Sequence, residues 1–301
     1  MQIFQIPFQA MASPCAIHLA AESLVQAQAA AAQAIAEVQR IERKYSRYRE
    51  DSLLANLHRC AGRVALAIDS ETSDLLDYAD LLFQASDGLF DISSGILGRA
   101  WNFKQATRPE PKYLAQLLAC VGWQRIERTK TEIYLPQAGM EIDFGGFGKE
   151  YAADRAATVL AELGVQSALI DLAGDLRILG GRPDGLAWQI GIQHPRPQKE
   201  PNELMASIPV FSGALTTSGD YERFIEIEGQ RYCHILNPKT GYPVSYWRSV
   251  SVLAPVALAA GSYATIAMLK EAQGQTFLEE SGLAYLAMDH TGSIYRRECQ
   301  S

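Results

Sequence analysis

The stretch MEIDFGGFGKEYAADR, residues 140 to 155, is the most informative pattern in the chain. An apolar entry leads to Asp143, glycines follow at 145, 146 and 148, and Lys149 opens a segment with helical periodicity. Glycines let backbone N–H groups approach an anion closely, and a helix N-terminus favours negative charge. The stretch therefore favours a phosphate-bearing ligand, with Lys149 as a point charge. Because it matches neither the P-loop pattern nor G-x-G-x-x-G, a plain glycine turn with a surface lysine explains the spacing equally well.

Outward from this stretch, the pattern predicts helices and strands without regular βαβ alternation. The helix after the glycines is expected to stop at Gly164. Further helices are expected over 21–45, from about 70 to 88, over 111–120 and as a pair over 257–281, and strands over 168–172, 188–192, 224–227 and 249–253. This mixture favours an α+β fold, a mixed sheet with packed helices, in a single large domain over 1–301 of one lobe or two.

The segment HPRPQKEPNE, His194 to Glu203, predicts a surface loop, because its prolines remove donors that a strand needs. A boundary between lobes is the alternative. No stretch approaches the roughly 20 apolar residues that span a membrane, so no membrane span is expected.

Composition excludes several classes of function. With 301 residues, 48% apolar and 20% charged, the chain can bury a full core. Its net charge of -7, and the absence of basic runs with interleaved aromatic residues, disfavour nucleic acid as a partner.

The cysteines and the N-terminus bear on location. The cysteines, at Cys15, Cys60, Cys120, Cys233 and Cys299, are odd in number and contain no C-x-x-C pair, so we expect neither a disulfide framework nor a zinc site. The N-terminal residues MQIFQIPFQAMASPC have no basic start and no long apolar core. We therefore expect a cytoplasmic protein.

Three other segments are open to two interpretations each. In HILNPKTGYP, His234 lies at a predicted strand end and suits a general base, although a structural histidine is the more common case. In GLFDISSGILGRAW, residues 88 to 101, Phe90 and Trp101 could simply be buried. Tyr48, in KYSRYREDSLLANL, is either a core aromatic residue or a group that stacks on a ligand.

The order of these segments resembles that of the FAD:protein FMN transferase (ApbE) family, over roughly residues 11–295. The matching segments are MASP, SRYREDSLLANL, the G-x-F-D segment closing on a tryptophan, D-x-G-x-x-x-K, DLAGD, T-S-G-x-Y and HILNPKTG. Each is weak alone, but so many in one order are hard to obtain by chance. The resemblance implies that the chain is a divergent member of this family.

The resemblance also implies an activity. Family members bind FAD and, with magnesium, transfer its FMN half to a threonine or serine hydroxyl of a target protein as a phosphoester, releasing AMP; some hydrolyse FAD instead. By motif position, the residues expected to contact FAD are Met11, Tyr48, Phe90, Asp91, Asp143, Lys149 and Leu236. His234 corresponds to the base that takes the proton of the attacking hydroxyl.

The implied metal site departs from the family pattern. It uses the backbone carbonyl of Gly146 and a late D-x-x-x-T motif, in which Thr265 is present but the aspartate position is Gly261. Because Mg²⁺ is usually held through one or two carboxylates plus substrate phosphates, this loss should weaken metal binding. Asp171 or Glu150 is a hypothetical substitute. The other departures are Asn237 in the HIxDP motif, Glu150 for a glycine after Lys149, and Asp171 and Ala173 in DLAGD.

Three functions remain as hypotheses: an FMN transferase, a FAD-binding protein without catalysis, and a FAD pyrophosphatase. Gly261 supports the second and counts against the third, which needs the same metal. Restoring an aspartate at position 261 is expected to separate a decayed enzyme, which would gain magnesium-dependent turnover, from a site that has been rebuilt or abandoned.

Overall fold

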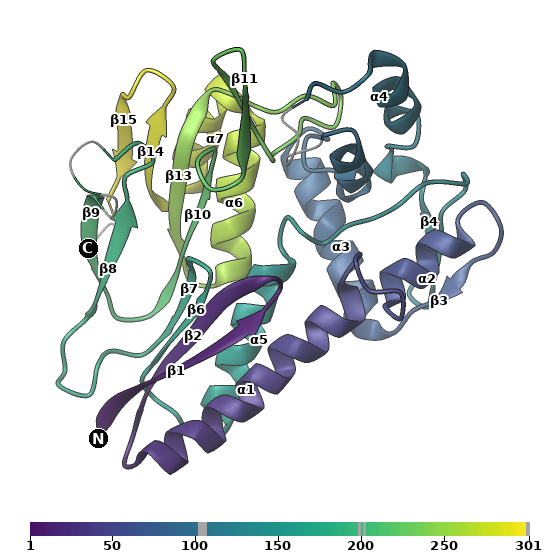
Figure 1. Cartoon of the computed structure of the whole chain (residues 1–301). Helices are drawn as coiled ribbons and strands as arrows, with labels where there is room; N and C mark the ends of the chain where they lie inside the picture. The colour runs from purple at the N-terminus through teal and green to yellow at the C-terminus, as the bar shows by residue number, and fades with distance from the viewer. Residues whose placement is uncertain (102–106, 198–199, 201–202, 299–301) are drawn as a thin grey trace.

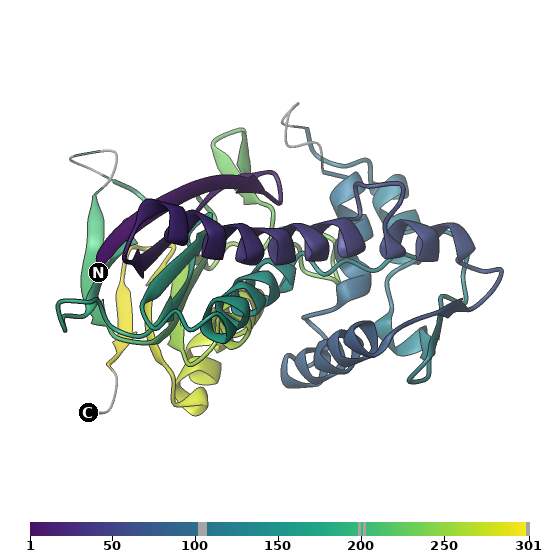
Figure 2. The same ribbon diagram turned by 90° about the horizontal axis from the view of Figure 1, so that it is seen from below.

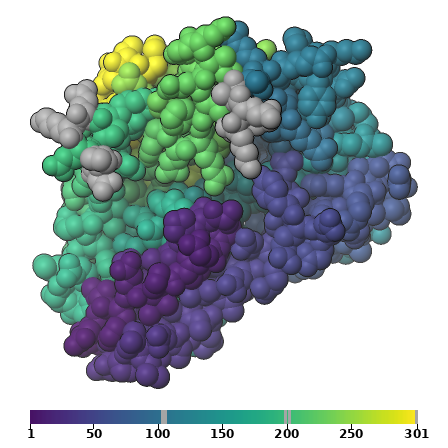
Figure 3. All heavy atoms as spheres, viewed as in Figure 1, coloured from purple at the N-terminus to yellow at the C-terminus, as the bar shows by residue number. Residues whose placement is uncertain are grey.

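The computed structural model describes residues 1–101, 107–197, 200 and 203–298. Figure 1 shows a large sheet with helices packed on it, beside a smaller and mainly helical part. The long helix α1 (Leu24–Tyr45) runs from beside the sheet to the helical part (Figure 2). One buried hydrophobic cluster continues through both parts. The space-filling view shows a hollow where the tip of the N-terminal hairpin, the β11–β12 ribbon (Phe224–Ile227 and Gln230–Cys233) and the helical part approach one another (Figure 3).

The main sheet has eight strands, and every neighbouring pair is antiparallel. In spatial order they are β1 (Gln2–Ala10), β2 (Ser13–Ala21), β6 (Ala168–Leu172), β7 (Asp175–Leu179), β10 (Gly213–Gly219), β13 (Trp247–Ala254), β14 (Ala284–Asp289) and β15 (Ile294–Arg297). The helices packed with it, besides α1, are α5 (Gly148–Glu162), α6 (Ala257–Leu269) and α7 (Gly274–Ser281), with a short 3₁₀ turn, η3 (Glu271–Gln273), between the last two.

The helical part contains α2 (Leu53–Cys60), α3 (Ser70–Ala85), η1 (Ile92–Arg99), α4 (Pro111–Leu118) and η2 (Trp123–Arg125), with a small sheet of β3 (Leu66–Ala67), β4 (Glu127–Arg128) and β5 (Glu132–Tyr134). A separate two-stranded ribbon pairs β8 (Trp188–Gln193) with β9 (Leu204–Val210). The large antiparallel sheet with packed helices confirms the predicted α+β class. Among the described residues, no helix combines the length and the apolarity needed to cross a membrane.

The two faces of the main sheet bury different partners. Successive side chains of a strand point to opposite faces. On β6, Ala168, Ile170 and Leu172 accordingly join the cluster that contains the helices, whereas Leu169 joins Trp188 of the β8–β9 ribbon in a second cluster. The helices therefore cover one face of the sheet and the ribbon covers part of the other.

Small side chains bring α5 close to its neighbours. Ala152, Ala153 and Ala156 of α5 are fully buried, as are Ala31 and Ala34 of α1, and α5 packs against both α1 and α6. Alanine side chains let helix axes approach closely while burying apolar surface on both sides. This packing fixes the first turn of α5, which follows the glycine-rich segment.

The structure confirms the predicted helices and strands within a few residues at their ends. Sequence reasoning did not identify the β1–β2 hairpin, α2, β10 or the C-terminal β14 and β15. The 194–203 segment, of which 198–199 and 201–202 lie outside the described residues, connects the paired strands β8 and β9. The predicted loop is therefore a hairpin connection, and the lobe-boundary alternative is wrong.

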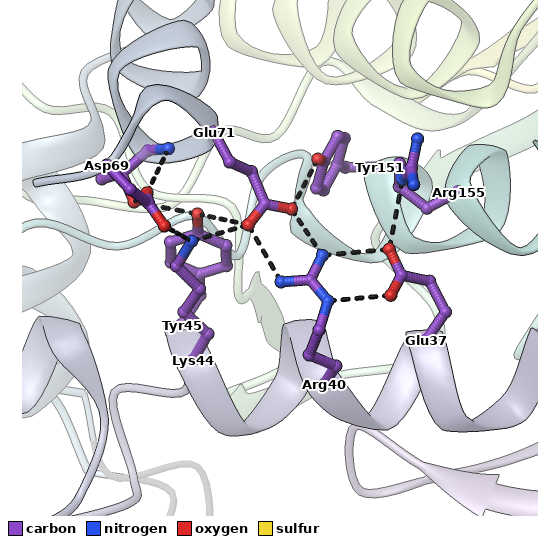
Figure 4. Close-up of polar contacts among 9 residues, drawn as sticks. Glu37, Arg40, Lys44, Tyr45, Asp69, Glu71, Tyr151 and Arg155 are labelled. Atoms are coloured by element: carbon purple, nitrogen blue, oxygen red, sulfur yellow. Dashed lines mark hydrogen bonds and ion pairs between the residues drawn. The ribbon is translucent and has the colours of Figure 1, made fainter. Parts of the chain in front are cut away.

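A network of charged side chains joins three helices beside this packing (Figure 4). Glu71 of α3 accepts hydrogen bonds from Arg40 (2.6 Å) and Lys44 (2.6 Å) of α1 and from the hydroxyl of Tyr151 of α5 (2.8 Å). Desolvation alone would raise the pKa of Glu71, but these hydrogen bonds outweigh it and hold the pKa well below its usual range. The network therefore stabilises the fold while Glu71 is ionised.

Replacing Glu71 with glutamine should lower the free energy of unfolding at pH 7 by about 1–2 kcal/mol, because charge-assisted hydrogen bonds to two cations are weakened. A depressed folded-state pKa gives stability that is present above the unfolded pKa, near 4.5, and is lost as pH falls below it. The difference between the parent chain and E71Q should therefore shrink below about pH 4.5 in urea titrations at several pH values. An equal difference at every pH would contradict this, and E162Q, at an exposed position of α5, is the control.

Candidate functional site

The glycine-rich segment forms a tight turn over buried aromatic rings. Asp143 accepts hydrogen bonds from the backbone N–H of Gly145 (2.9 Å) and from Arg47 (3.0 Å). A Cβ atom at Gly146 would lie 2.7 Å from the Cζ atom of the buried Phe90 ring. Position 146 is therefore confined to glycine by the ring beneath it. Three residues expected at the ligand site, Phe90, Asp143 and Gly146, thus meet at this turn.

Lys149, in the first turn of α5, is already paired with a carboxylate. Its Nζ atom lies 2.7 Å from Oδ2 of Asp175, which is 5% exposed, while the lysine side chain is 32% exposed. Desolvation would lower the pKa of Lys149, but the charge of Asp175, the hydrogen bond to it and the charges of Glu150 and Glu222 together raise the pKa. The ammonium group is therefore charged, and a bound phosphate would share it with Asp175.

Two strained turns lie at one end of the main sheet. Met11 and Ala12, between β1 and β2, have φ angles of 51° and 58°, and Ala173 and Gly174, between β6 and β7, have 54° and 90°. Two-residue hairpins of this kind prefer glycine or asparagine, and a left-handed residue with a side chain costs about 1–2 kcal/mol. Because Cys15 pairs with Leu172, the two turns are neighbours. Such strain is typical of functional sites, and Met11 is one of the strained residues.

His234 directly follows β12 and is held by the backbone of Arg223. The backbone N–H of His234 donates to the carbonyl oxygen of Arg223 (3.1 Å), and Nδ1 of the ring lies 3.3 Å from the same oxygen. A proton on Nδ1 would be donated to this carbonyl, leaving Nε2 as an acceptor. Although the ring reaches solvent, desolvation by surrounding protein lowers its pKa, and the charge of Lys149 lowers it further. The imidazole is therefore neutral at pH 7.

Thr265 and position 261 lie one helical turn apart on α6, facing α5 and β10. The Thr265 hydroxyl is 2.9 Å from the hydroxyl of Ser218 on β10. A Cβ atom at Gly261 would lie 2.4 Å from Oε1 and 2.6 Å from Cγ of Glu150. The side chain of Glu150 therefore fills the space that a side chain at position 261 would need.

Glu150 is a buried carboxylate with incomplete hydrogen bonding. It is 7% exposed, and its Oε2 atom has no hydrogen-bond partner among the described residues. Burial raises its pKa to about 8, and the charge of Asp175 raises it too, against the charge of Lys149. Buried polar atoms are nearly always hydrogen-bonded, so an unpartnered carboxylate oxygen calls for an explanation.

Asp171, the other hypothetical substitute for the missing aspartate, points elsewhere. It alternates with Ile170 and Leu172 on β6, so its side chain lies on the face opposite the helices. There it accepts a hydrogen bond from the backbone N–H of Gly174 (2.8 Å). Of the two substitutes, only Glu150 borders position 261.

The remaining predicted residues occupy varied environments. Asp91 is buried and accepts hydrogen bonds from the backbone and hydroxyl of Ser93 and from the backbone of Trp123, so it caps η1. Tyr48 is 90% exposed beside the Arg47 guanidinium, so the core interpretation of this residue is wrong. Leu236 is half-buried and packs against two small clusters at the edge of the helical part.

An open pocket of about 640 Å³ is lined by Asp91 and Gly88 and by Pro238 and Lys239, among others. It joins the G-x-F-D segment to the segment that follows His234, but Asp91 is the one predicted ligand residue in its lining. The pocket therefore neighbours the residues described above without enclosing them.

Three contributors were not identified in the sequence: Asp175, Ser218 and Arg47. Asp175 follows a glycine at a hairpin turn, and Ser218 stands inside T-S-G, so both lie within segments that the sequence analysis had marked. Their partners, Lys149 and Thr265, are distant in sequence, and no local pattern indicates such pairs.

The contact between Glu150 and position 261 predicts a stability coupling. In the parent chain, Gly261→Ala should lower the free energy of unfolding by about 1 kcal/mol. Overpacking against Glu150 costs about 1–3 kcal/mol, whereas the higher helix propensity of alanine stabilises the chain by about 1 kcal/mol. In an E150A background the same change should raise it by about 1 kcal/mol. Urea unfolding of the four chains measures the coupling, and an equal effect of G261A in both backgrounds would contradict it.

The same contact changes how the effect of a Gly261→Asp substitution must be interpreted. With Glu150 present, the new side chain has no room and would bring a second carboxylate against a buried one. A failure of Gly261→Asp to raise turnover would therefore not distinguish a rebuilt site from an abandoned one, and the substitution is informative only when Glu150 is also changed.

Comparisons with known proteins identify a family and several relatives to which this chain is similar. The ApbE family model matches residues 11–287. The chain is 32% identical to the FAD:protein FMN transferase of Treponema pallidum over 246 residues, which cover 76% of this chain and 67% of that protein. It is 29% identical to the protein of the same name from Haemophilus influenzae over 257 residues, covering 81% and 73%.

Solved structures share the fold. The ApbE protein from Thermotoga maritima superimposes with a TM-score of 0.89 at 26% identity, covering 99% of this chain and 97% of that chain. The apo form of the Pseudomonas stutzeri flavinyl transferase ApbE gives a TM-score of 0.85 at 23% identity, with coverages of 99% and 95%. The strands missed in the sequence thus belong to an architecture that other proteins also have.

Proposed function

Because this chain belongs to the ApbE family, we propose that it is an FAD:protein FMN transferase, which moves FMN from FAD to a hydroxyl of a target protein and releases AMP. The observation that supports this most is the charged Lys149 in the first turn of α5, which is close enough to His234 for its charge to lower the pKa of that imidazole. The alternatives, a non-catalytic FAD-binding protein and a FAD pyrophosphatase, are not favoured, since the relatives carry the transferase name.

The proposed reaction is a phosphoryl-type transfer within the FAD pyrophosphate. The hydroxyl oxygen of an acceptor threonine or serine attacks the phosphorus of the FMN half, a new P–O ester bond forms, and the P–O bond to AMP breaks. His234 takes the proton of the attacking hydroxyl at Nε2 and later releases it to solvent. Lys149 offsets negative charge on the phosphate oxygens, because such transfers depend mainly on positioning and electrostatics.

The remaining predicted residues would hold the flavin dinucleotide. Met11, Tyr48, Phe90, Asp91, Asp143, Lys149 and Leu236 are proposed to form or support its binding surface. The exposed ring of Tyr48 supports stacking on an aromatic ligand face. Phe90 and Asp91 act from below the surface, since both are buried and shape the glycine turn and η1.

The oxygen donors beside α5 fit a magnesium ion. The described residues contain no group of three or more His, Cys, Asp or Glu side chains arranged as a metal site, so a mixed donor set is required. The backbone carbonyl of Gly146, the Thr265 hydroxyl and the unpartnered Oε2 of Glu150 are oxygen donors of the kind that Mg²⁺ prefers. When bound, the ion would offset charge on the FAD phosphates.

We also propose a cytoplasmic location. The support is the sequence pattern of widely spaced cysteines without a pairing motif, which is typical of a reducing compartment.

Replacing His234 with asparagine should lower the rate of AMP release and acceptor labelling by about 10²–10⁴-fold, because no base remains to take the hydroxyl proton. FAD binding should persist. Since desolvation lowers the His234 pKa below its ordinary 6.5, the rate of the parent chain should stay level around pH 7 and fall only as pH drops through that lowered pKa. The assay follows AMP and covalent flavin on an acceptor peptide.

His290 provides a matched control, because its Nδ1 atom also lies 3.3 Å from a backbone carbonyl, that of Tyr246. The variant H290N should keep full activity. An active H234N, or equal losses in both variants, would contradict the assignment of the base. Release of AMP without labelled acceptor in the parent chain would indicate a pyrophosphatase instead.

A further inference from the structure

We propose that the carboxylate of Glu150 replaces the side chain missing at position 261 as an oxygen ligand for a divalent cation, beside Thr265 and the Gly146 carbonyl. The inference rests on the proposed function, because the cation acts on the phosphates of the flavin dinucleotide. It assigns a ligand role to a residue that lies on a different helix from position 261.

The first support is the place of the carboxylate. Glu150 reaches from the first turn of α5 into the gap on α6, so that its Oε1 and Cδ atoms lie 2.4 and 2.8 Å from where a Cβ at position 261 would be. A short acidic side chain on Gly261 would occupy the same space. The carboxyl group that α5 offers therefore lies close to where one carried by position 261 on α6 would lie.

The second support is the unmet bonding capacity of this carboxylate. Each neighbouring charge is already engaged: Lys149 with Asp175 (2.7 Å), and Asp154 with Arg177 (2.9 Å) and the backbone N–H groups at the start of α6. The nearby hydroxyl of Tyr78 donates to Ser262 (2.9 Å) or to the carbonyl of Leu258 (3.1 Å). Among the residues that the structure describes, Oε2 of Glu150 therefore has no hydrogen-bond partner, and the residue is 7% exposed.

An uncharged role for Glu150 makes a different prediction. If the side chain only filled the gap left by Gly261, a glutamine of the same shape would fill it equally well. Its amide group would also supply hydrogen-bond donors to the surrounding acceptor oxygens. A cation ligand instead requires the carboxylate. The conservative change E150Q therefore separates the two roles without creating a cavity.

The test uses the full chain with FAD bound and Mn²⁺ as the probe ion. FAD binding is first measured without metal by flavin fluorescence, and free Mn²⁺ is then followed by electron paramagnetic resonance during a titration. In E150Q, we expect Mn²⁺ affinity to fall by about tenfold or more, with FAD binding in the absence of metal unchanged. D171N, which changes the other acidic candidate, should match the parent chain.

The swap variant E150G/G261D keeps the test decisive even if E150Q folds poorly. It returns the carboxylate to α6, and we expect it to bind Mn²⁺ within about threefold of the parent chain, since the donor set is restored. Unchanged Mn²⁺ affinity in a folded E150Q, or a folded swap variant that binds no Mn²⁺, would overturn the inference. A parent chain that binds no FAD at all would instead count against the proposed function.

Discussion

The close packing of α5 against α1 and α6 is the constraint on which the rest of the structure depends. Alanines on the buried faces of α5 and α1 bring the helices together over the sheet, and Glu71 joins α3 to the same group through Arg40, Lys44 and Tyr151. The first turn of α5 is thereby fixed beside β7 and α6. Its residues meet Asp175 on one side and the gap at Gly261 on the other, so the packing of an alanine-rich helix positions the chemistry.

Two departures from the family pattern, at positions 150 and 261, are in contact in the structure. The loss of a side chain at position 261 and the presence of a long acidic one at position 150 each look damaging alone, because the first removes a possible metal ligand and the second buries an ionisable group. In the structure they touch, and the side chain of one fills the space of the other. This contact favours a transferase whose metal site has been rebuilt over one that has decayed.

The sequence predicted the elements with strong periodicity, including α1, α5 and the buried strands β6 and β13, because their apolar residues repeat at helical or strand spacing. It did not predict β1, although half-buried and exposed residues alternate along that strand from Phe4 to Gln9, or β10, whose sequence is a run of small and hydroxyl-bearing residues. The sequence also left Asp171 and Glu150 as equal substitutes. Only the sheet register, which turns Asp171 to the opposite face, separates them, and no local pattern determines that register.

The most direct measurement of the central claim is a crystal structure of the chain grown with FAD and Mn²⁺, with anomalous scattering used to locate the metal. The account predicts a manganese peak between the first turn of α5 and Thr265 of α6, coordinated by a carboxylate oxygen of Glu150 and by a phosphate oxygen of FAD. A manganese ion at the FAD phosphates whose coordination leaves out Glu150 would contradict it.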